Sequence, residues 1–309
     1  MAIYKNILDT IGGTPLVELN ALALKAGAGA RILAKLEARN PGGSAKDRAA
    51  LYMIRAAESA GTLKKGMLLV EPTSGNTGVG LALAAAVLGY QLVLVMPDTM
   101  SIERRKLAAA YGARIVLTPG ALGMRGAVEE AERIAREENG FIPDQFNNPA
   151  NAQAHYDTTA REILADMAGE PVAAFVSAVG TGGTLTGIGR ALREADAGTR
   201  IVAVEPAESP LLSGGKAGPH GIQGIGANFV PGVLDRALID EVMTVKTEDA
   251  LETARMAART EGVLCGISSG AALAAALRLG ARSEYAGRTI VTVLPDTGER
   301  YLSTALFGE

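Results

Sequence analysis

One lysine of this chain stands where the positive charge of its side chain is disfavoured. The segment Asn40–Arg48 reads Asn-Pro-Gly-Gly-Ser-Ala-Lys-Asp-Arg, and Ser44 and Asp47 have the Ser-x-x-Asp spacing of a helix capping box. This spacing predicts that Lys46 lies in the first turn of a helix, beside the partial positive charge of the helix N-terminus. Such a position favours the neutral amine, the nucleophile that forms Schiff bases with carbonyl compounds. The alternative is an ordinary solvated lysine in a capped helix.

The scarcity of histidine and cysteine narrows the chemistry further. The chain has two histidines, His155 on an expected helix and His220 in a Gly/Pro-rich loop, and neither adjoins a nucleophile-elbow sequence. The single cysteine, Cys265, lies in an apolar stretch and is expected to be a buried, inert thiol. So few potential ligands leave no multi-histidine or zinc site, and no metal is expected. Lys46 is therefore the leading candidate for acid–base work.

Composition places the chain among ordinary soluble globular proteins. Its 309 residues are 48% hydrophobic and 20% charged, enough for one large or two smaller cores. A net charge of −3, with basic and acidic residues interspersed, provides no footprint for nucleic acid or an anionic membrane. The N-terminus lacks a secretory signal, and the longest apolar run, 79–88, is too short for a bilayer. We expect a cytoplasmic protein.

Strand-like and helix-like runs alternate along most of the chain. This alternation predicts an α/β fold with mostly parallel sheets covered by helices on both faces. Two such series meet near Pro149, so we expect two α/β domains, 1–150 and 151–309, with a cleft between them. Strands are expected at 32–36, 67–70, 92–96, 115–117, 173–179, 201–204, 242–245 and 289–294, and helices at 51–60, 79–88, 102–111, 127–138, 152–167, 185–195, 249–260 and 271–279. Residues 209–232 show no periodic pattern, and a loop of this length suggests function.

The glycine-rich segment Gly180-Thr181-Gly182-Gly183-Thr184 follows an expected strand and opens an expected helix. Glycine lets the backbone approach an anion, and amides at a helix start point toward it, so the segment predicts a phosphate site. A plain glycine-rich turn is the alternative. A dinucleotide fingerprint is a second one, since Gly180, Gly182 and Glu205 fit it, but Leu185 stands where the third glycine belongs. The pattern favours a compact monophosphate.

Three further loops have unusual composition. Thr73-Ser74-Gly75-Asn76-Thr77-Gly78 is dense in uncharged donors and precedes a helix, which suits a bound carboxylate, although a simple capping turn is the alternative. Gly266–Gly270 contains two serines, either of which can cap the next helix. Gln145–Pro149 stands at the domain boundary and is equally consistent with a part of the binding site and with a simple polar turn.

Taken together, these segments resemble the cysteine synthase family, the O-acetylserine sulfhydrylases, which are fold type II enzymes that use pyridoxal 5′-phosphate (PLP). The resemblance runs nearly end to end and is carried by an ordered set of motifs. They are the segments 11–17, 40–48, 71–78, 96–101, 145–146, 180–184, 222–227, 266–270 and 298–303. The family fold is the expected pair of α/β domains. The resemblance also implies that about 40–150 is a mobile substrate-binding part and that the first ~35 residues pack on the other domain.

The resemblance implies a role for each matching residue. Lys46 matches the lysine that holds PLP, and Gly180, Thr181, Gly182, Gly183 and Thr184 match the phosphate cup. Asn76 matches the asparagine that bonds the ring oxygen of the cofactor, and Ser268 the serine that faces its pyridine nitrogen. A neutral serine there suits β-elimination and replacement rather than transamination. The substrate residues implied are Thr73, Ser74, Thr77 and Gln145 at the carboxylate, with Gly224 in a loop facing the substrate.

The implied reaction is the replacement of acetate in O-acetyl-L-serine by sulfide, which gives L-cysteine. Lys46, once freed, would remove the α-proton. Within the same class, the alternatives are cystathionine β-synthase, an O-phosphoserine sulfhydrylase and, further away, a threonine or serine dehydratase. An NAD-dependent dehydrogenase is the remote alternative from another class. The resemblance also implies a homodimer. It further implies a complex with the C-terminal tail of serine acetyltransferase, which members of the family often form.

Two positions depart from the pattern of the family. Ala45 stands where valine is usual before the lysine, a change in packing volume. Asn228 follows Gly226-Ala227 where glycine is usual. Asn tolerates positive φ better than most residues, so we expect the loop to keep its conformation.

Overall fold

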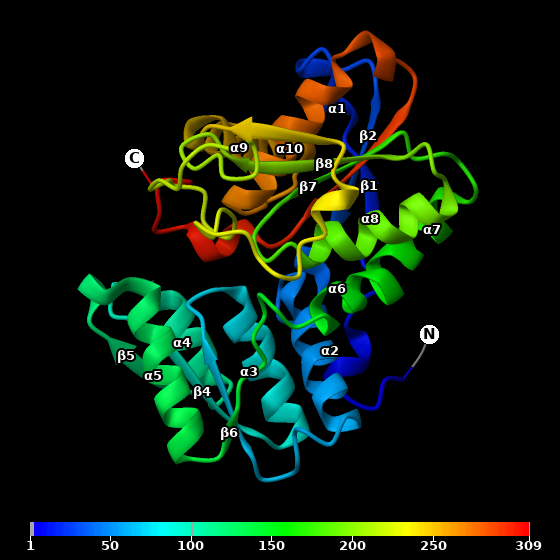
Figure 1. Ribbon diagram of the computed structural model, residues 1–309. Helices are drawn as coiled ribbons and strands as arrows, with labels where there is room; N and C mark the ends of the chain where they lie inside the picture. The colour runs from blue at the N-terminus through cyan, green and yellow to red at the C-terminus, as the bar shows by residue number, and fades with distance from the viewer. Residues whose placement is uncertain (1–2, 100–101, 309) are drawn as a thin grey trace. The chain divides into compact units, whose positions relative to one another are not determined.

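A computed structural model describes residues 3–99 and 102–308 of the chain (Figure 1). The chain divides into two compact units, each described by itself below. The first combines Met1–Ile11 with Asn40–Asn151, and the second combines Gly12–Arg39 with Ala152–Glu309. Short 3₁₀ turns join the main elements of both units, at Ile7–Thr10, Glu37–Arg39, Gly120–Leu122, Arg236–Leu238, Ser283–Tyr285 and Gly298–Tyr301.

The first unit contains a parallel sheet in the order β5-β4-β3-β6. Its strands are β3 (Leu68–Pro72), β4 (Gln91–Pro97), β5 (Arg114–Thr118) and β6 (Gly140–Phe141). Its helices are α2 (Lys46–Ser59), α3 (Asn76–Leu88), α4 (Ile102–Ala110) and α5 (Gly123–Glu137). Alternate residues of the strands enter different cores, because successive side chains of a strand point to opposite faces. Leu69 packs with α2 and α3, whereas Val70 packs with α5.

The second unit contains a six-stranded sheet in the order β1-β2-β10-β7-β8-β9. Only β1 is antiparallel to its neighbour; the other pairs are parallel. Its strands are β1 (Leu16–Glu18), β2 (Arg31–Leu36), β7 (Ala174–Ala178), β8 (Arg200–Pro206), β9 (Glu241–Val245) and β10 (Thr289–Leu294). Its helices are α1 (Asn20–Lys25), α7 (Ala160–Met167), α8 (Gly183–Ala195), α9 (Thr247–Glu261) and α10 (Ile267–Gly280), and α6 (Ala150–Ala154) begins at the boundary.

Both faces of the larger sheet are covered by helices. Val202 and Val204 of β8 lie in the core with α9 and α10, and Ile201 and Ala203 lie in the core with α7 and α8. Parallel strands buried on both faces explain the nearly continuous apolar runs in the sequence. The expected α/β class with mostly parallel sheets is confirmed.

Several local expectations are corrected by the structure. The three-residue β1, the two-residue β6 and the six-residue α1 were not predicted, because they are too short to show a periodic pattern. The helix expected over 152–167 is interrupted by a π-helix at His155–Thr159. The loop 209–232 is irregular, as expected.

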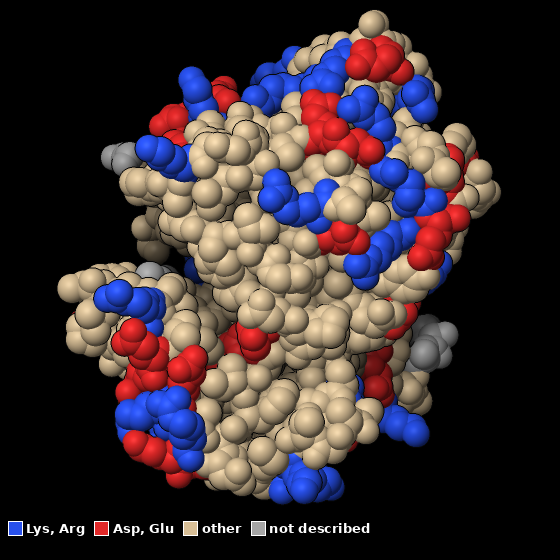
Figure 2. Space-filling view, in the orientation of Figure 1, with Lys and Arg blue, Asp and Glu red and all other residues tan. Residues whose placement is uncertain are grey.

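The surface carries charges of both signs side by side. Figure 2 shows acidic and basic side chains interspersed over the face in view. Ion pairs such as Arg114–Glu138 and Arg133–Glu130 join neighbours of opposite charge. Within the described ranges, no helix is long and apolar enough to cross a membrane.

Candidate active site

The residues predicted to bind cofactor and substrate are divided between the two units. The first unit holds Lys46, Thr73, Ser74, Asn76, Thr77 and Gln145. The second holds Gly180, Thr181, Gly182, Gly183, Thr184, Gly224 and Ser268.

Lys46 is the first residue of α2, which confirms its expected place in the first turn of a helix. The predicted capping box is wrong. Ala45, fully buried, occupies the N-cap position; the Ser44 hydroxyl accepts from the backbone N–H of Lys46 at 3.2 Å, and the Asp47 carboxylate accepts from the N–H of Gly42 at 2.6 Å. The glycine turn before the helix brings that amide within reach of Asp47. A Cβ added at Gly42 would lie 2.5 Å from the nearer carboxylate oxygen.

Helix α3 packs closely against the start of α2. A Cβ at Gly80 would lie 2.8 Å from the carbonyl oxygen of Lys46, closer than real Cβ atoms approach a backbone oxygen. Glycine at this position therefore lets α3 lie against the turn that carries Lys46. Gly80 carries no signal in the sequence, because a buried glycine inside a helix shows its purpose only through what it faces.

The Thr73–Thr77 segment joins β3 to α3. Gly75 is the N-cap residue, no side chain there caps the helix, and α3 begins at Asn76. Thr73, which is buried, accepts from the N–H of Gly75 through its hydroxyl at 3.3 Å. The partial positive charge at the start of a helix suits a bound anion. The hydroxyl of Thr77 donates to Oε1 of Gln145 at 2.5 Å, so the structure joins two of the predicted substrate residues directly.

The backbone of Gln145 is hydrogen-bonded to a buried acidic side chain. The carboxylate of Glu71, on β3, accepts from the backbone N–H groups of Asp144 at 3.1 Å and Gln145 at 3.3 Å. Asn151 donates its side-chain amide to the carbonyl of Gln145 at 2.8 Å. Burial raises the pKa of Glu71 to about 8. Glu71 belongs to the 71–78 motif, but no role was predicted for its side chain; an acid at the end of an apolar strand was the available signal.

The predicted phosphate cup lies where β7 passes into α8. Gly182 is the N-cap residue, with φ of +84° and no side-chain cap. A Cβ at Gly180 would lie 2.4 Å from the carbonyl oxygen of Gly224, and one at Gly182 would lie 2.6 Å from the Cβ of Leu234. The cup thus offers backbone amides and two threonine hydroxyls, with no acidic side chain in its five residues. Such a set of donors fits the phosphate of PLP.

Gly224 and Ser268 lie together in the second unit. Gly224 has φ of +96°, and the Ser268 hydroxyl is 3.5 Å from the place that a Cβ at Gly224 would take. Ser268 is the second residue of α10 and is buried. The N-cap residue of α10 is Gly266, without a side-chain cap, so the alternative that a serine caps this helix is wrong.

Asn228 adopts the expected left-handed conformation, with φ of +63°. Its Oδ1 accepts from the hydroxyl of Ser209 at 2.8 Å, which ties this end of the loop to the segment after β8. The loop keeps a residue with a side chain where the family usually has glycine. The expectation for Asn228 is confirmed.

The other residues considered in the sequence lie outside the two groups of site residues. Cys265 is 1% exposed, and burial, with the charge of Asp296 second, raises the pKa of its thiol to about 12. Glu205, which the dinucleotide alternative required, accepts from the N–H groups of Leu212 at 2.6 Å and Ser213 at 2.9 Å. Leu185 is buried in the core with α7, where a helix of the dinucleotide type would need glycine. Among the described residues, no group of three or more His, Cys, Asp or Glu side chains is placed to hold a metal ion.

Comparison with known proteins gives matches over nearly the whole chain. A family model for pyridoxal-phosphate dependent enzymes matches residues 7–296. A curated cysteine synthase of Staphylococcus aureus (strain Mu50) is 50% identical over 303 residues, which cover 98% of this chain and 96% of that protein. The range matched by the family model, 7–296, spans the positions of both groups described above.

The structure is also similar to solved structures. A cysteine synthase of Entamoeba histolytica superposes with a TM-score of 0.96 at 48% identity, covering 99% of this chain and 91% of that one. An O-ureido-L-serine synthase superposes with a TM-score of 0.95, also at 48% identity, covering 99% and 96%. A hydrogen sulfide-producing enzyme of Fusobacterium nucleatum follows at 0.93 and 44%, covering 98% and 99%.

Proposed function

The chain belongs to the pyridoxal-phosphate dependent enzymes, and we infer that it is a cysteine synthase, which replaces the acetate of O-acetyl-L-serine by sulfide. One observation carries this conclusion. A chain 50% identical to a cysteine synthase over nearly its full length places Lys46 at a helix start, and its proposed phosphate cup contains no acidic side chain. The products are L-cysteine and acetate.

The cofactor supplies the electronic part of the chemistry. When bound, PLP draws electrons from the α-carbon of an amino acid and so makes its α-proton easier to remove. We propose that the amine of Lys46 holds the cofactor between turnovers and takes this α-proton when the substrate has displaced it. The same amine returns a proton to the α-carbon once sulfide has added. The position of Lys46 as the first residue of α2 supports this role, because it is the helix-start position expected for the lysine that holds the cofactor.

The substrate carboxylate is assigned to the start of α3. Because Thr77 gives its proton to Oε1 of Gln145, it orients that amide with the NH₂ end turned away from Thr77. The NH₂ group, with Thr73, Ser74 and the uncapped amides of α3, is proposed to receive the carboxylate. Asn76 is proposed to bond the ring oxygen of PLP.

In the second unit, Gly180–Thr184 is proposed to take the phosphate. Ser268 is proposed to face the pyridine nitrogen, and Gly224 to line the substrate side. A neutral hydroxyl at that nitrogen limits its protonation and moderates the electron withdrawal by the ring, which suits β-replacement. The close contact between Ser268 and the Gly224 segment supports placing both at one ring.

Lys46→Ala tests the lysine role, with Lys65→Ala as the matched control because Lys65 is an exposed lysine of the same unit. Lys46→Ala should abolish both turnover and the visible absorbance of the bound cofactor, and borohydride reduction should fail to attach the cofactor to this variant. Lys65→Ala should behave as the parent. Normal turnover by Lys46→Ala would end the proposal.

The β-leaving group and the nucleophile need a separate test. The structural likeness to an O-ureido-L-serine synthase, whose named product is an O-substituted serine, favours one second candidate, a synthase that uses an oxygen nucleophile. The assay compares O-acetylserine, O-phosphoserine and serine as donors, and sulfide, homocysteine and hydroxyurea as acceptors. Cysteine formed most efficiently from O-acetylserine and sulfide supports the conclusion. Preference for serine with homocysteine would replace it by cystathionine β-synthase, and preference for O-phosphoserine by the corresponding sulfhydrylase.

We further propose that the enzyme is a cytoplasmic homodimer whose site accepts the C-terminal tail of serine acetyltransferase. The support is the resemblance of the motifs to the family. Sedimentation of the holoenzyme should give twice the mass of the 31.7 kDa chain. Titration with a peptide ending in isoleucine should change the absorbance of the bound cofactor, and a silent titration would remove this partner from the account.

A further inference from the structure

A buried histidine stands directly behind the proposed phosphate cup. His155 opens the π-helix that separates α6 from α7, and it is 0% exposed. A π-turn inserts one extra residue into a helix, and such turns recur at functional sites. The proposed chemistry of Lys46 makes no use of this side chain.

The contact between His155 and the cup depends on a glycine of α8. A Cβ at Gly187 would lie 2.2 Å from the carbonyl oxygen of Ala152 and 2.8 Å from the N of Tyr156. Glycine therefore lets α8 lie against the backbone of the π-helix. Thr184, one turn earlier on α8, meets the ring: its Oγ1 is 3.2 Å from Nε2 of His155.

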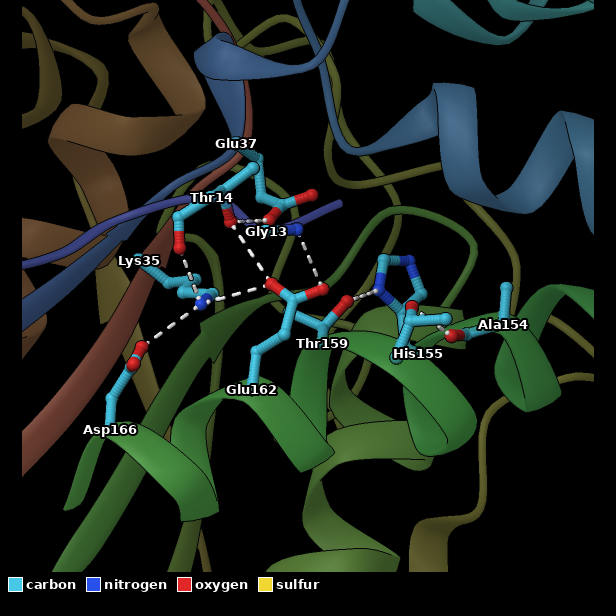
Figure 3. Close-up of polar contacts among 10 residues, drawn as sticks. Gly13, Thr14, Lys35, Glu37, Ala154, His155, Thr159, Glu162 and Asp166 are labelled. Atoms are coloured by element: carbon cyan, nitrogen blue, oxygen red, sulfur yellow. Dashed lines mark hydrogen bonds and ion pairs between the residues drawn. The ribbon is translucent and has the colours of Figure 1, made fainter. Parts of the chain in front are cut away.

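The other ring nitrogen is fixed within the same π-helix. Nδ1 of His155 lies 2.9 Å from Oγ1 of Thr159, as Figure 3 shows. The ring thus stands between two threonine hydroxyls, one on its own helix and one in the cup. Each hydroxyl either donates or accepts, so the tautomer of His155 decides where both protons point.

The helix that carries His155 is itself anchored (Figure 3). Glu162 of α7 accepts from the N–H of Gly13 at 3.0 Å and pairs with Lys35 at 3.0 Å. Lys35, fully buried on β2, also donates to the carbonyl of Thr14 at 2.6 Å and pairs with Asp166 at 3.3 Å. This network holds α7, and with it the π-helix, against β2 and the 13–14 segment.

Hydrogen-bond chemistry then selects one tautomer, given the proposed cofactor site, on which this inference rests. A phosphate only accepts hydrogen bonds, so Thr184 helps to bind it only by donating its single hydroxyl proton. That proton is available if His155 donates to Thr184 rather than accepting from it. We propose that His155 is a positioning residue: as the neutral Nε2–H tautomer it donates to Oγ1 of Thr184 and directs the hydroxyl proton of Thr184 toward the PLP phosphate, while Nδ1 accepts from Thr159.

The holoenzyme labelled with ¹⁵N-histidine tests this directly, because the chain has two histidines. His220 is an internal reference: its Nε2 faces the carbonyl oxygen of Gly226 at 2.9 Å, which can only accept. The variant His220→Gln assigns the remaining signals to His155. At neutral pH we expect the nitrogen shifts of His155 to report a protonated Nε2 and an unprotonated Nδ1. A protonated Nδ1, in either the other tautomer or the cation, would overturn the proposal.

A pair of variants gives a second readout. The side-chain amide of glutamine places its N–H near the position of Nε2, whereas that of asparagine reaches only the position of Nδ1. We expect cofactor release to be about tenfold faster in His155→Asn and to change by about twofold or less in His155→Gln, the loss of one hydrogen bond being the difference. Equal release rates would contradict the proposal, and if His155→Asn does not fold, the nitrogen shifts of the parent decide.

The outcomes separate this proposal from the proposed function. The ³¹P spectrum of the holoenzyme reports whether a phosphate is bound at all. A bound phosphate with the wrong tautomer rejects only the role of His155. The absence of any bound phosphate after loading with PLP would instead reject the cofactor site, and with it the cysteine synthase assignment.

Discussion

Helices α3 and α8 begin in the same way, although they belong to different units. Each has 13 residues, follows a parallel strand, and has a glycine N-cap without a side-chain cap. The second residue is threonine in both, Thr77 and Thr184, and each contacts a buried side chain. The fifth residue is glycine in both, Gly80 and Gly187, and each lies under a neighbouring backbone carbonyl.

The two helix starts differ in the partner of the threonine. Thr77 gives its proton to the amide oxygen of Gln145, which leaves the amide nitrogen as the donor. Thr184 meets an imidazole nitrogen, which in the proposed tautomer leaves the threonine as the donor. In the proposed roles, one backbone arrangement therefore suits two anions, an exchanging carboxylate and a resident phosphate, and a single neighbouring side chain decides which group offers the proton.

The largest expected effect is a pH dependence of stability at the start of α3, caused by Glu71. Glu71 backs Gln145, and burial raises its pKa to about 8, whereas an unfolded glutamate titrates near 4.5. Between pH 4.5 and about 8 the folded state keeps a proton on Glu71 that the unfolded state has released. The contribution of Glu71 to the free energy of unfolding is therefore complete below pH 4.5 and is lost as pH rises to about 8. The loss is on the order of 5 kcal/mol.

The measurement is the midpoint of thermal unfolding of the parent and of Glu71→Gln across this range. The glutamine of the variant cannot ionise. The unfolding temperature of the variant, relative to that of the parent, should therefore increase as pH rises to about 8. Parallel curves would show that Glu71 is ionised in the fold, and the distinction between the two helix starts would then lose its electrostatic part.

The next effect concerns the glycines at the fifth position. In Gly187→Ala the new Cβ meets the carbonyl oxygen of Ala152 at 2.2 Å, so α8 must move away from His155 at a cost of about 3 kcal/mol. Gly189→Ala, on the same helix, is the control, because its Cβ meets only side-chain atoms of Ile201 from 3.4 Å. Thermal unfolding and cofactor retention should fall in the first variant only. Equal effects would mean that the close approach at Gly187 is not what matters.

A smaller effect is expected when each of the two threonines is replaced by valine. Thr77→Val should raise the KM for O-acetylserine by about five- to tenfold with cofactor retention unchanged, since Gln145 loses its orientation. Thr184→Val should speed cofactor release by a similar factor with little change in KM. Steady-state kinetics and cofactor release, measured on both variants, give the full comparison. If both variants moved the same parameter, the division into substrate and cofactor sites would be wrong.

The smallest effect is expected for Asn228→Gly. Glycine removes the cost of φ of +63° but also the bond from Ser209, so Asn228→Gly should change unfolding by less than about 1 kcal/mol. Asn228→Ala loses the bond and keeps the strain, and should cost about 1–2 kcal/mol more. Chemical denaturation measures both variants. An alanine variant as stable as the glycine variant would show that backbone strain does not select asparagine here.

The sequence predicted much of this fold because its signals are strong and local. Buried parallel strands such as β4 and β8 read as unbroken apolar runs, and glycine at 180 and 182 marks a backbone that must come close to something. The αL conformation of Asn228 agreed with the glycine that is usual at this position in the family and with the tolerance of asparagine for positive φ.

Other features escaped because they depend on contacts distant in the chain. The Ser44–Asp47 spacing predicted a capping box, but a preceding glycine turn offered Asp47 a nearer amide, that of Gly42. The π-turn at His155 has no periodic signature. It packs against α8 at Gly187, which is separated from Ala152 by more than 30 residues of sequence.

The burial of Cys265 has a practical side. A protein that handles sulfide keeps its own sulfur nucleophile protonated and out of reach of reagents, with a pKa of about 12. The native enzyme should therefore resist alkylation and persulfide formation without added reductant. A cysteine engineered on the surface would then be the sole reactive handle for a fluorophore or spin label on each chain, with no background to remove.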